Sequence, residues 1–140
     1  MAKEITQRNL MEEENKKRVI LVGIDGSGES TQALQRALRY LCTEHDSFLI
    51  VHAQPTASSK IKALTGYSRM YPDILKTIED DIKRSTEEIF ARAKEECAEE
   101  QVVAEMEAVT GDARDVLCNA VKEYNADMLV LGSHGNGPMK

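Results

Sequence analysis

The chain has 140 residues, of which 41% are hydrophobic and 30% charged, and its formal net charge at pH 7 is −6. A chain of this length forms one domain with a core of its own, and it has no apolar run long enough for a transmembrane helix. Its acidic balance argues against broad binding of nucleic acid or of anionic membranes, because both need a basic surface.

The N-terminal residues 1–18 are rich in both charges and poor in apolar anchors, which predicts a flexible charged tail. They lack the apolar segment of a signal peptide. The three cysteines form neither a CxxC pair nor an even set, so we expect reduced thiols that fill the core from helices: Cys42, Cys97 and Cys118. These features predict a cytoplasmic protein, with the nucleus as a second compartment.

Residues 19–24 (VILVGI) form a continuous apolar, β-branched run, which is typical of a strand buried on both faces. A glycine-rich turn follows at residues 25–30. Apolar residues at helical spacing then predict an amphipathic helix over residues 31–44, capped by Ser30 or Thr31.

A second buried strand is predicted over residues 47–53, where His52 is expected as a half-buried histidine with a satisfied hydrogen bond. Residues 54–71 contain proline, glycine and several serines without a clear period. They predict a long loop with at most a helical turn near residues 61–64. An apolar stripe then predicts a long helix over residues 73–99.

Partial alternation over residues 101–109 predicts an edge strand with one wetter face. The turn at residues 110–112 leads into a helix that ends at residues 125–127. A fourth buried strand over residues 128–131 runs into a second glycine-rich segment, residues 132–137.

The alternation of strands and helices predicts an α/β fold, a three-layer doubly wound parallel sheet. If strands two and three wind outward from strand one, strand four returns to the other flank of strand one. The carboxyl ends of strands one and four then border a topological switch point, which is where sheets of this kind bind ligands.

Both glycine-rich turns fall at those two carboxyl ends, and together they predict a nucleotide-phosphate site, because glycine lets backbone N–H groups approach an anion. Asp25 is either a turn-forming residue or a partner for a ribose hydroxyl or for a water on Mg²⁺. His134 is either a plain loop residue or a phosphate contact. A Walker A motif is excluded because Glu29 stands where lysine is needed.

These residues resemble the universal stress protein family from residue 17 to residue 140. The resemblance rests on residues 18–25 (RVILVGID), 49–53 (LIVHA), 110–112 (TGD) and, above all, 128–137 (MLVLGSHGNG). It implies a domain over residues 19–140 and a sheet of five strands in the order 3-2-1-4-5.

Family members with the pattern G-x2-G-x9-G-[ST] are expected to bind ATP. Gly132 and Gly135 match its first two glycines, whereas the third would fall beyond Lys140. The resemblance therefore implies a domain without its last loop and without its fifth strand.

The resemblance also implies the ligand and its contacts. ATP or AMP, alone or with Mg²⁺, is expected to have Ile24 and Asp25 near ribose and adenine, Ala53 at the adenine edge, and Gly132 and Gly135 at ribose and phosphate. The full set of expected binding residues is Ile24, Asp25, Ala53, Gly132, Ser133, His134, Gly135 and Gly137.

Members of this family commonly dimerise through their last strand. The resemblance therefore implies a homodimer. We expect a dimer or higher assembly with strand 128–131, left as an edge, or the adjacent helices at the contact, or else poor solubility.

The sequence shows no activated nucleophile, acid–base pair or metal cluster. We therefore expect a protein of the stress response that binds its nucleotide as a regulatory ligand, with at most weak ATP hydrolysis. Two alternatives stay open. One is a nucleotide-free interaction module that dimerises. The other is an adenylating ATP pyrophosphatase, because residues 25–30 faintly resemble the pyrophosphate loop of such enzymes.

Overall fold

The computed structural model describes residues 18–41, 43–65 and 72–132. The predicted tail thus lies outside the described residues, except for Arg18. The elements in chain order are β1 (Arg18–Ile24), α2 (Gly28–Arg36), the π-helical turn η1 (Ala37–Leu41), β2 (Asp46–Gln54), α3 (Ala57–Thr65), α4 (Pro72–Glu99), β3 (Ala104–Thr110), α5 (Ala113–Glu123) and β4 (Met128–Val130).

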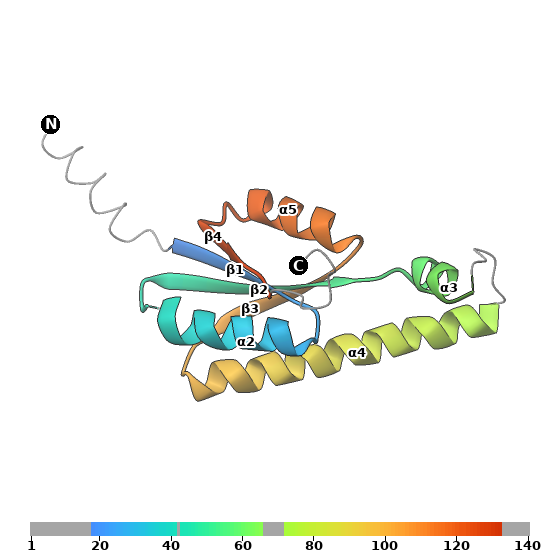
Figure 1. Ribbon diagram of the computed structural model, residues 1–140, viewed down its shortest axis with the longest axis horizontal. Coiled ribbons are helices and arrows are strands. Elements are labelled where there is room, and N and C mark those ends of the chain that lie inside the picture. The colour runs from blue at the N-terminus through green and yellow to red at the C-terminus, as the bar shows by residue number, and fades with distance from the viewer. Residues whose placement is uncertain (1–17, 42, 66–71, 133–140) are drawn as a thin grey trace, which may run out of the picture.

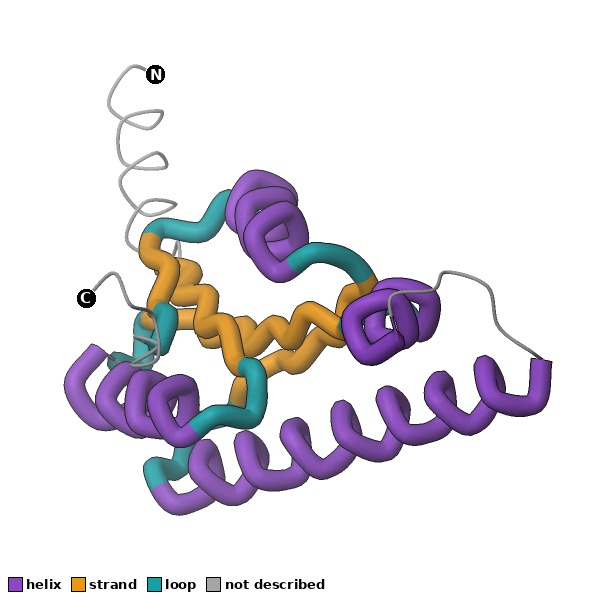
Figure 2. The backbone as a smooth tube through the Cα atoms, turned by 45° about the vertical axis from the view of Figure 1, so that its right-hand side comes forward, coloured by secondary structure: helices purple, strands orange, loops and turns teal. Residues whose placement is uncertain are grey.

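The described strands form one parallel sheet in the order β3-β2-β1-β4. Helices α2 and α4 cover one face of this sheet, and α5 covers the other (Figures 1 and 2). The predicted three-layer, doubly wound arrangement is confirmed, including the return of β4 to the flank of β1 opposite β2. None of the described helices is both long and apolar enough to cross a membrane.

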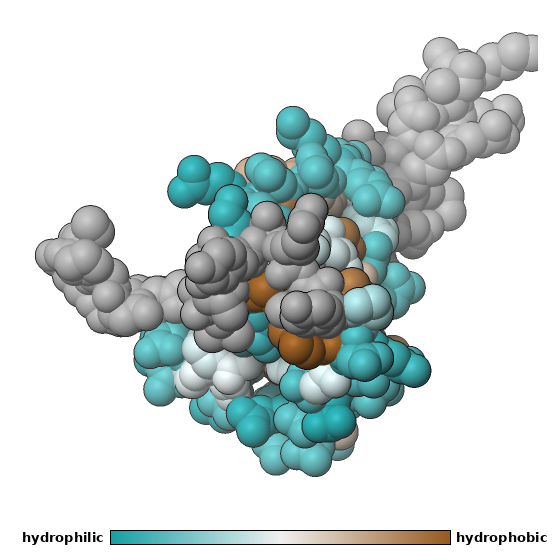
Figure 3. Space-filling model, turned by 90° about the vertical axis from the view of Figure 1, so that its right-hand side faces the viewer, coloured by the Kyte–Doolittle hydropathy of each residue, from teal (hydrophilic) through white to brown (hydrophobic). Residues whose placement is uncertain are grey.

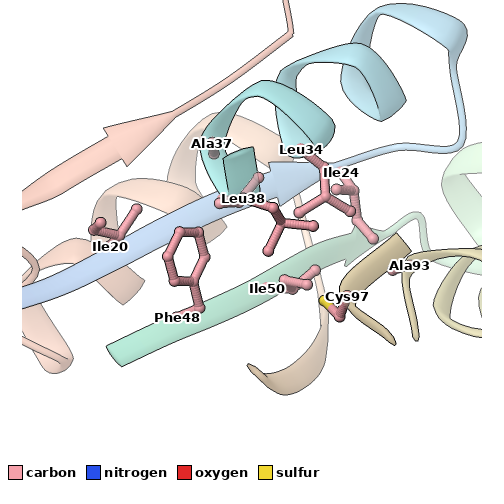
Figure 4. Packing of buried hydrophobic residues seen from close by; sticks show 10 residues of the cluster. Ile20, Ile24, Leu34, Ala37, Leu38, Phe48, Ile50, Ala93 and Cys97 are labelled. Carbon is pink, nitrogen blue, oxygen red and sulfur yellow. The ribbon is translucent and has the colours of Figure 1, made fainter. Parts of the chain in front are cut away.

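Strand β1 is buried on both faces, as its unbroken apolar run predicts. Ile20, Leu21 and Val22 are each 0% exposed. The even-numbered residues join the larger core cluster, which Phe48, Ile50 and the helices α2 and α4 complete (Figure 4). Leu21 instead joins a smaller cluster beneath α5. One short strand therefore supplies both cores.

Side chains tie the amino ends of the strands together. The Asp46 carboxylate accepts hydrogen bonds from Arg18 Nε at 3.0 Å and Nη2 at 2.9 Å, and from the Thr43 N–H at 2.9 Å. The hydrogen bond from Arg18 is the main reason that the pKa of Asp46 is lowered from its usual value. The Asp127 carboxylate accepts from the Val19 N–H at 2.7 Å, just before β4 begins. These contacts fix where three neighbouring strands start.

Helix α2 begins at Gly28, three residues before the predicted start. Its N-cap is Ser27, whose Oγ accepts a hydrogen bond from the Ser30 N–H at 3.1 Å. Ser30 is itself buried, and its hydroxyl donates to the Ser27 carbonyl at 3.1 Å. The expected cap at Ser30 or Thr31 is therefore wrong, because the first helical turn precedes the apolar stripe that revealed the helix.

The expected loop over residues 54–71 is wrong in its middle part, where α3 forms. Thr56 directly precedes this helix, and its Oγ1 accepts a hydrogen bond from the Ser59 N–H of the first turn at 2.9 Å. Ile61 is buried, and α3 packs on α4. Two consecutive serines and few apolar residues concealed the helix, since Ile61 is the one deeply buried side chain among residues 57–62. Residues 66–71 lie outside the described residues.

Tyr124, at the end of α5, donates its hydroxyl hydrogen to the Glu107 carboxylate of β3. This hydrogen bond, followed by burial, raises the pKa of Tyr124 from 10.0 to about 12. The folded state thus holds the phenolic proton more tightly than the unfolded state. The contribution to stability is complete below about pH 10 and is lost as the pH rises through about 12.

We expect the free energy of unfolding to fall between about pH 10 and about pH 12, and Tyr124→Phe to weaken that dependence. Urea unfolding across this pH range measures it. Tyr40→Phe is the matched control, because Tyr40 is 75% exposed. Equal pH dependences for the two variants would contradict the role given to the Tyr124–Glu107 pair.

Candidate functional site

The candidate site is a cavity of about 360 Å³ at the carboxyl ends of β1, β2 and β4, on the sheet face that α5 covers. Four of the predicted site residues line it: Ile24, Asp25, Ala53 and Gly132. Figure 3 looks toward this end of the molecule and shows apolar surface near the middle and polar side chains toward the rim. The structure thus brings together residues from three strands, at the switch point that the sequence predicted.

The other four predicted site residues lie outside the described residues: Ser133, His134, Gly135 and Gly137. Their part in a site stays a prediction. The described wall of the cavity ends at Gly132.

Asp25 forms the turn that closes β1. Its Oδ1 accepts a hydrogen bond from the Ser27 N–H at 2.8 Å, and Gly26 between them has φ of +85°, a conformation that favours glycine. The turn-forming role considered for Asp25 is therefore present. The residue is also exposed and lines the cavity.

Gly132 lies against the backbone of the first turn of α2. A Cβ atom at this position would stand 2.6 Å from both the Glu29 carbonyl carbon and the Ser30 nitrogen, closer than real Cβ contacts. The end of β4 can approach α2 this closely only without a side chain. Glycine here is thus a packing requirement of the site.

His52 of β2 does not line the cavity and contacts the end of β1 from the sheet face that α4 covers. It is buried, and its Nδ1 lies 2.8 Å from the Ile24 carbonyl oxygen. Because a carbonyl only accepts, Nδ1 carries the hydrogen. The ring of Phe90 meets the His52 ring edge-on, with centroids 6.2 Å apart. The prediction of a satisfied histidine is confirmed, although His52 is more buried than expected.

Sequence reasoning missed the wall that α5 gives to the cavity. This wall consists of Ala113, Arg114, Leu117 and Cys118. Helical spacing could have revealed this wall. Val116 and Ala120, four residues apart, are buried on one side of α5, and Cys118, two residues from each, therefore points to a different side.

The core-filling role predicted for the cysteines is confirmed for Cys97, which is buried, and is wrong for Cys118, which is exposed. Cys42 lies outside the described residues.

The family model described as the universal stress protein family matches residues 17–140. The chain belongs to the universal stress protein family. Universal stress protein YxiE of Bacillus subtilis (strain 168) is 30% identical over 121 residues, which cover 86% of this chain and 82% of that protein.

Solved universal stress proteins share the fold. UspA from Lactobacillus plantarum aligns with a TM-score of 0.68 at 15% identity, covering 89% of this chain and 83% of its own. A family protein from Arabidopsis thaliana with AMP bound aligns with a TM-score of 0.63 at 22% identity, covering 86% and 80%. The described order β3-β2-β1-β4 agrees with the first four places of the strand order expected for this family.

We expect Gly132→Ala to lower the free energy of unfolding by about 1–3 kcal/mol, because the added Cβ meets backbone atoms that must shift. Gly28→Ala is the matched control, since a Cβ there meets nothing within 4 Å. Chemical denaturation of both variants measures the difference. If Gly132→Ala were as stable as Gly28→Ala, the close approach of β4 to α2 would be refuted.

Proposed function

We propose that this universal stress protein binds an adenine nucleotide, ATP or AMP, as a regulatory ligand in the stress response. The observation that carries the proposal is the cavity at the switch point, which Ile24, Asp25, Ala53 and Gly132 line together. Membership of the family and the AMP held by the Arabidopsis protein of the same fold support it. A nucleotide-regulated role is consistent with a cytoplasmic protein, because its ligand is intracellular.

The cavity suits the separate parts of such a ligand. Aliphatic side chains, among them Val51 and Leu117, offer an apolar wall to the base. The Asp25 carboxylate is placed to accept a hydrogen bond from a ribose hydroxyl. The proposal assigns the phosphates to the glycine-rich segment that starts at Gly132 and continues with Ser133, His134, Gly135 and Gly137.

Mg²⁺ enters this proposal only with the nucleotide. Among the residues that the structure describes, no three His, Cys, Asp or Glu side chains converge on a common point. Phosphate oxygens and water would therefore supply most of the ligands, as is common for Mg²⁺, and Asp25 would hold the ion through a water.

The proposal is for binding rather than turnover. Ser30 is the serine of the described cavity wall, and its hydroxyl is buried and donates to the Ser27 carbonyl. It is thus poorly placed as a nucleophile. Release of AMP and pyrophosphate from ATP by the purified protein would favour an adenylating enzyme instead. Mass spectrometry that finds no nucleotide in purified protein, and calorimetry that finds no binding, would favour a nucleotide-free interaction module.

We expect Asp25→Ala to weaken nucleotide binding by about 1–2 kcal/mol, because it removes a hydrogen bond to ribose. Isothermal titration calorimetry with AMP and ATP measures the loss. Asp25→Asn is the matched variant, since its amide oxygen can still accept from the Ser27 N–H and keep the turn. Identical titration curves for all three proteins would remove Asp25 from the site.

We also propose that the chain forms a homodimer with β4 at the contact. In the described sheet β4 pairs with β1 and stands at the edge. Its residues carry no charge and no proline, the usual protection of an edge. Leu129 is 39% exposed and Leu131, next along the chain, is 51% exposed. Association would remove this apolar surface from water.

We expect light scattering at about 100 μM to show a dimer, and Leu131→Lys to shift the chain toward monomer. Leu131 is a better site for this test than Val130, which packs against the core. Val103→Lys is the control, because Val103 is 96% exposed and lies before β3 at the opposite edge. A wild-type monomer at this concentration, or equal effects of both lysines in folded proteins, would overturn the dimer.

A further inference from the structure

The cavity has an unusual charge balance for a site that receives an anion. Of the described residues that line it, Arg114 is the one with a positive charge, and Asp25 is the one with a negative charge. Glu29 adds a carboxylate in the first turn of α2, whose backbone touches Gly132. The whole chain has a net charge of −6. A phosphate group entering this site therefore finds one cationic side chain among the described lining residues, Arg114.

Arg114 stands in the first turn of α5, is exposed, and makes no hydrogen bond or ion pair with any residue that the structure describes. Its acidic neighbours do not engage it: the Asp112 carboxylate instead accepts from the Asp115 N–H at 3.4 Å as the cap of α5. Some other arginines are held by carboxylates. Arg18 is held by Asp46 at 2.9 Å, and Arg84 lies 3.5 Å from Asp81. The guanidinium of Arg114 thus keeps its donors available at the cavity.

The guanidinium group matches a phosphate in shape as well as in charge. It is planar and always protonated, and its N–H groups can pair with two oxygens of one phosphate. The long side chain of Arg114 starts from the α5 wall, beside Leu117 and Cys118, and can follow a ligand across a cavity of about 360 Å³. In contrast, the contacts that the aliphatic wall offers to the adenine base do not depend on charge.

We propose that Arg114 binds a phosphate group of the adenine nucleotide and gives the site its preference for nucleotides over nucleosides. The inference rests on the proposed function of the same cavity. It assigns Arg114 a role in ligand selection: adenosine and AMP share the base and ribose contacts, and the guanidinium adds affinity for AMP alone.

The test is a calorimetric titration of AMP and of adenosine into wild type, Arg114→Gln and Arg92→Gln. Arg92→Gln makes the same change in net charge, on α4, where Arg92 lines a neighbouring cavity of about 250 Å³ on the α2 and α4 side of the sheet. This cavity shares Ile24, Asp25 and Ser30 with the candidate site but not its α5 wall. We expect Arg114→Gln to lower AMP affinity about tenfold, a typical loss for a hydrogen bond to a charged group, and to change adenosine affinity less than about twofold. Arg92→Gln should leave both affinities within about twofold of wild type. Arg114→Lys keeps the charge without the planar group, and its AMP affinity should fall between those of wild type and Arg114→Gln.

A second readout reports whether the ligand sits in this cavity. Saturating AMP should slow alkylation of the exposed Cys118, followed by peptide mass spectrometry, while the buried Cys97 stays unreactive in the folded protein. Protection of Cys118 in wild type supports the location on which the inference depends.

Each other outcome overturns a distinct claim. If wild type binds AMP and Arg114→Gln binds it equally well, Arg114 has no role. If AMP and adenosine affinities fall together in folded Arg114→Gln, the side chain contacts the base and not the phosphate. If Arg92→Gln matches Arg114→Gln, the effect is one of overall charge. If wild type binds neither ligand and AMP leaves Cys118 alkylation unchanged, the proposed function itself fails.

Discussion

Burial of β1 on both faces is the constraint from which the rest of the structure follows. A strand with Ile20, Leu21 and Val22 at 0% exposure needs a helical layer above and below and a strand on each flank. Since β1 lies at the centre of the layers, its carboxyl end is the point at which the apolar run gives way to a polar turn. Asp25 and the cavity beside it occupy that point. The position of the site is therefore a consequence of core packing.

Much of the fold could be predicted because buried parallel strands leave a strong signal in the sequence. The run that became β1 has no polar interruption after Arg18, and that of β2 is unbroken from Phe48 to Val51. The long apolar stripe of α4 fixed that helix to within a residue at its start. Two glycine-rich turns after the first and fourth predicted strands placed Asp25 and Gly132 at one crevice. Ile24 and Ala53 were added by the family resemblance, and all four residues line one cavity.

The features that the sequence concealed are those in which exposed residues carry the information. Periodicity marks the buried side of a helix, so it found Val116 and Ala120 of α5 and not Arg114 and Cys118, which face the cavity. Ser27 was overlooked as a cap because a cap precedes the apolar pattern. Helix α3 was overlooked because, of its side chains at residues 57–62, only Ile61 is deeply buried. Each of these features depends on contacts in space that the apolar pattern of one helix does not report.

The length of α4 has a consequence for how the molecule opens. At about 1.5 Å per residue, Pro72–Glu99 is roughly 42 Å long, whereas the longest strand, Asp46–Gln54, spans roughly 30 Å. The amino-terminal turns of α4 therefore reach beyond the sheet, where α3 accompanies them (Figure 1). In this overhang α3, and not the sheet, packs on α4. We therefore expect its backbone amides to exchange through local opening, and the amides of β1 and β2 to exchange only when the whole domain unfolds.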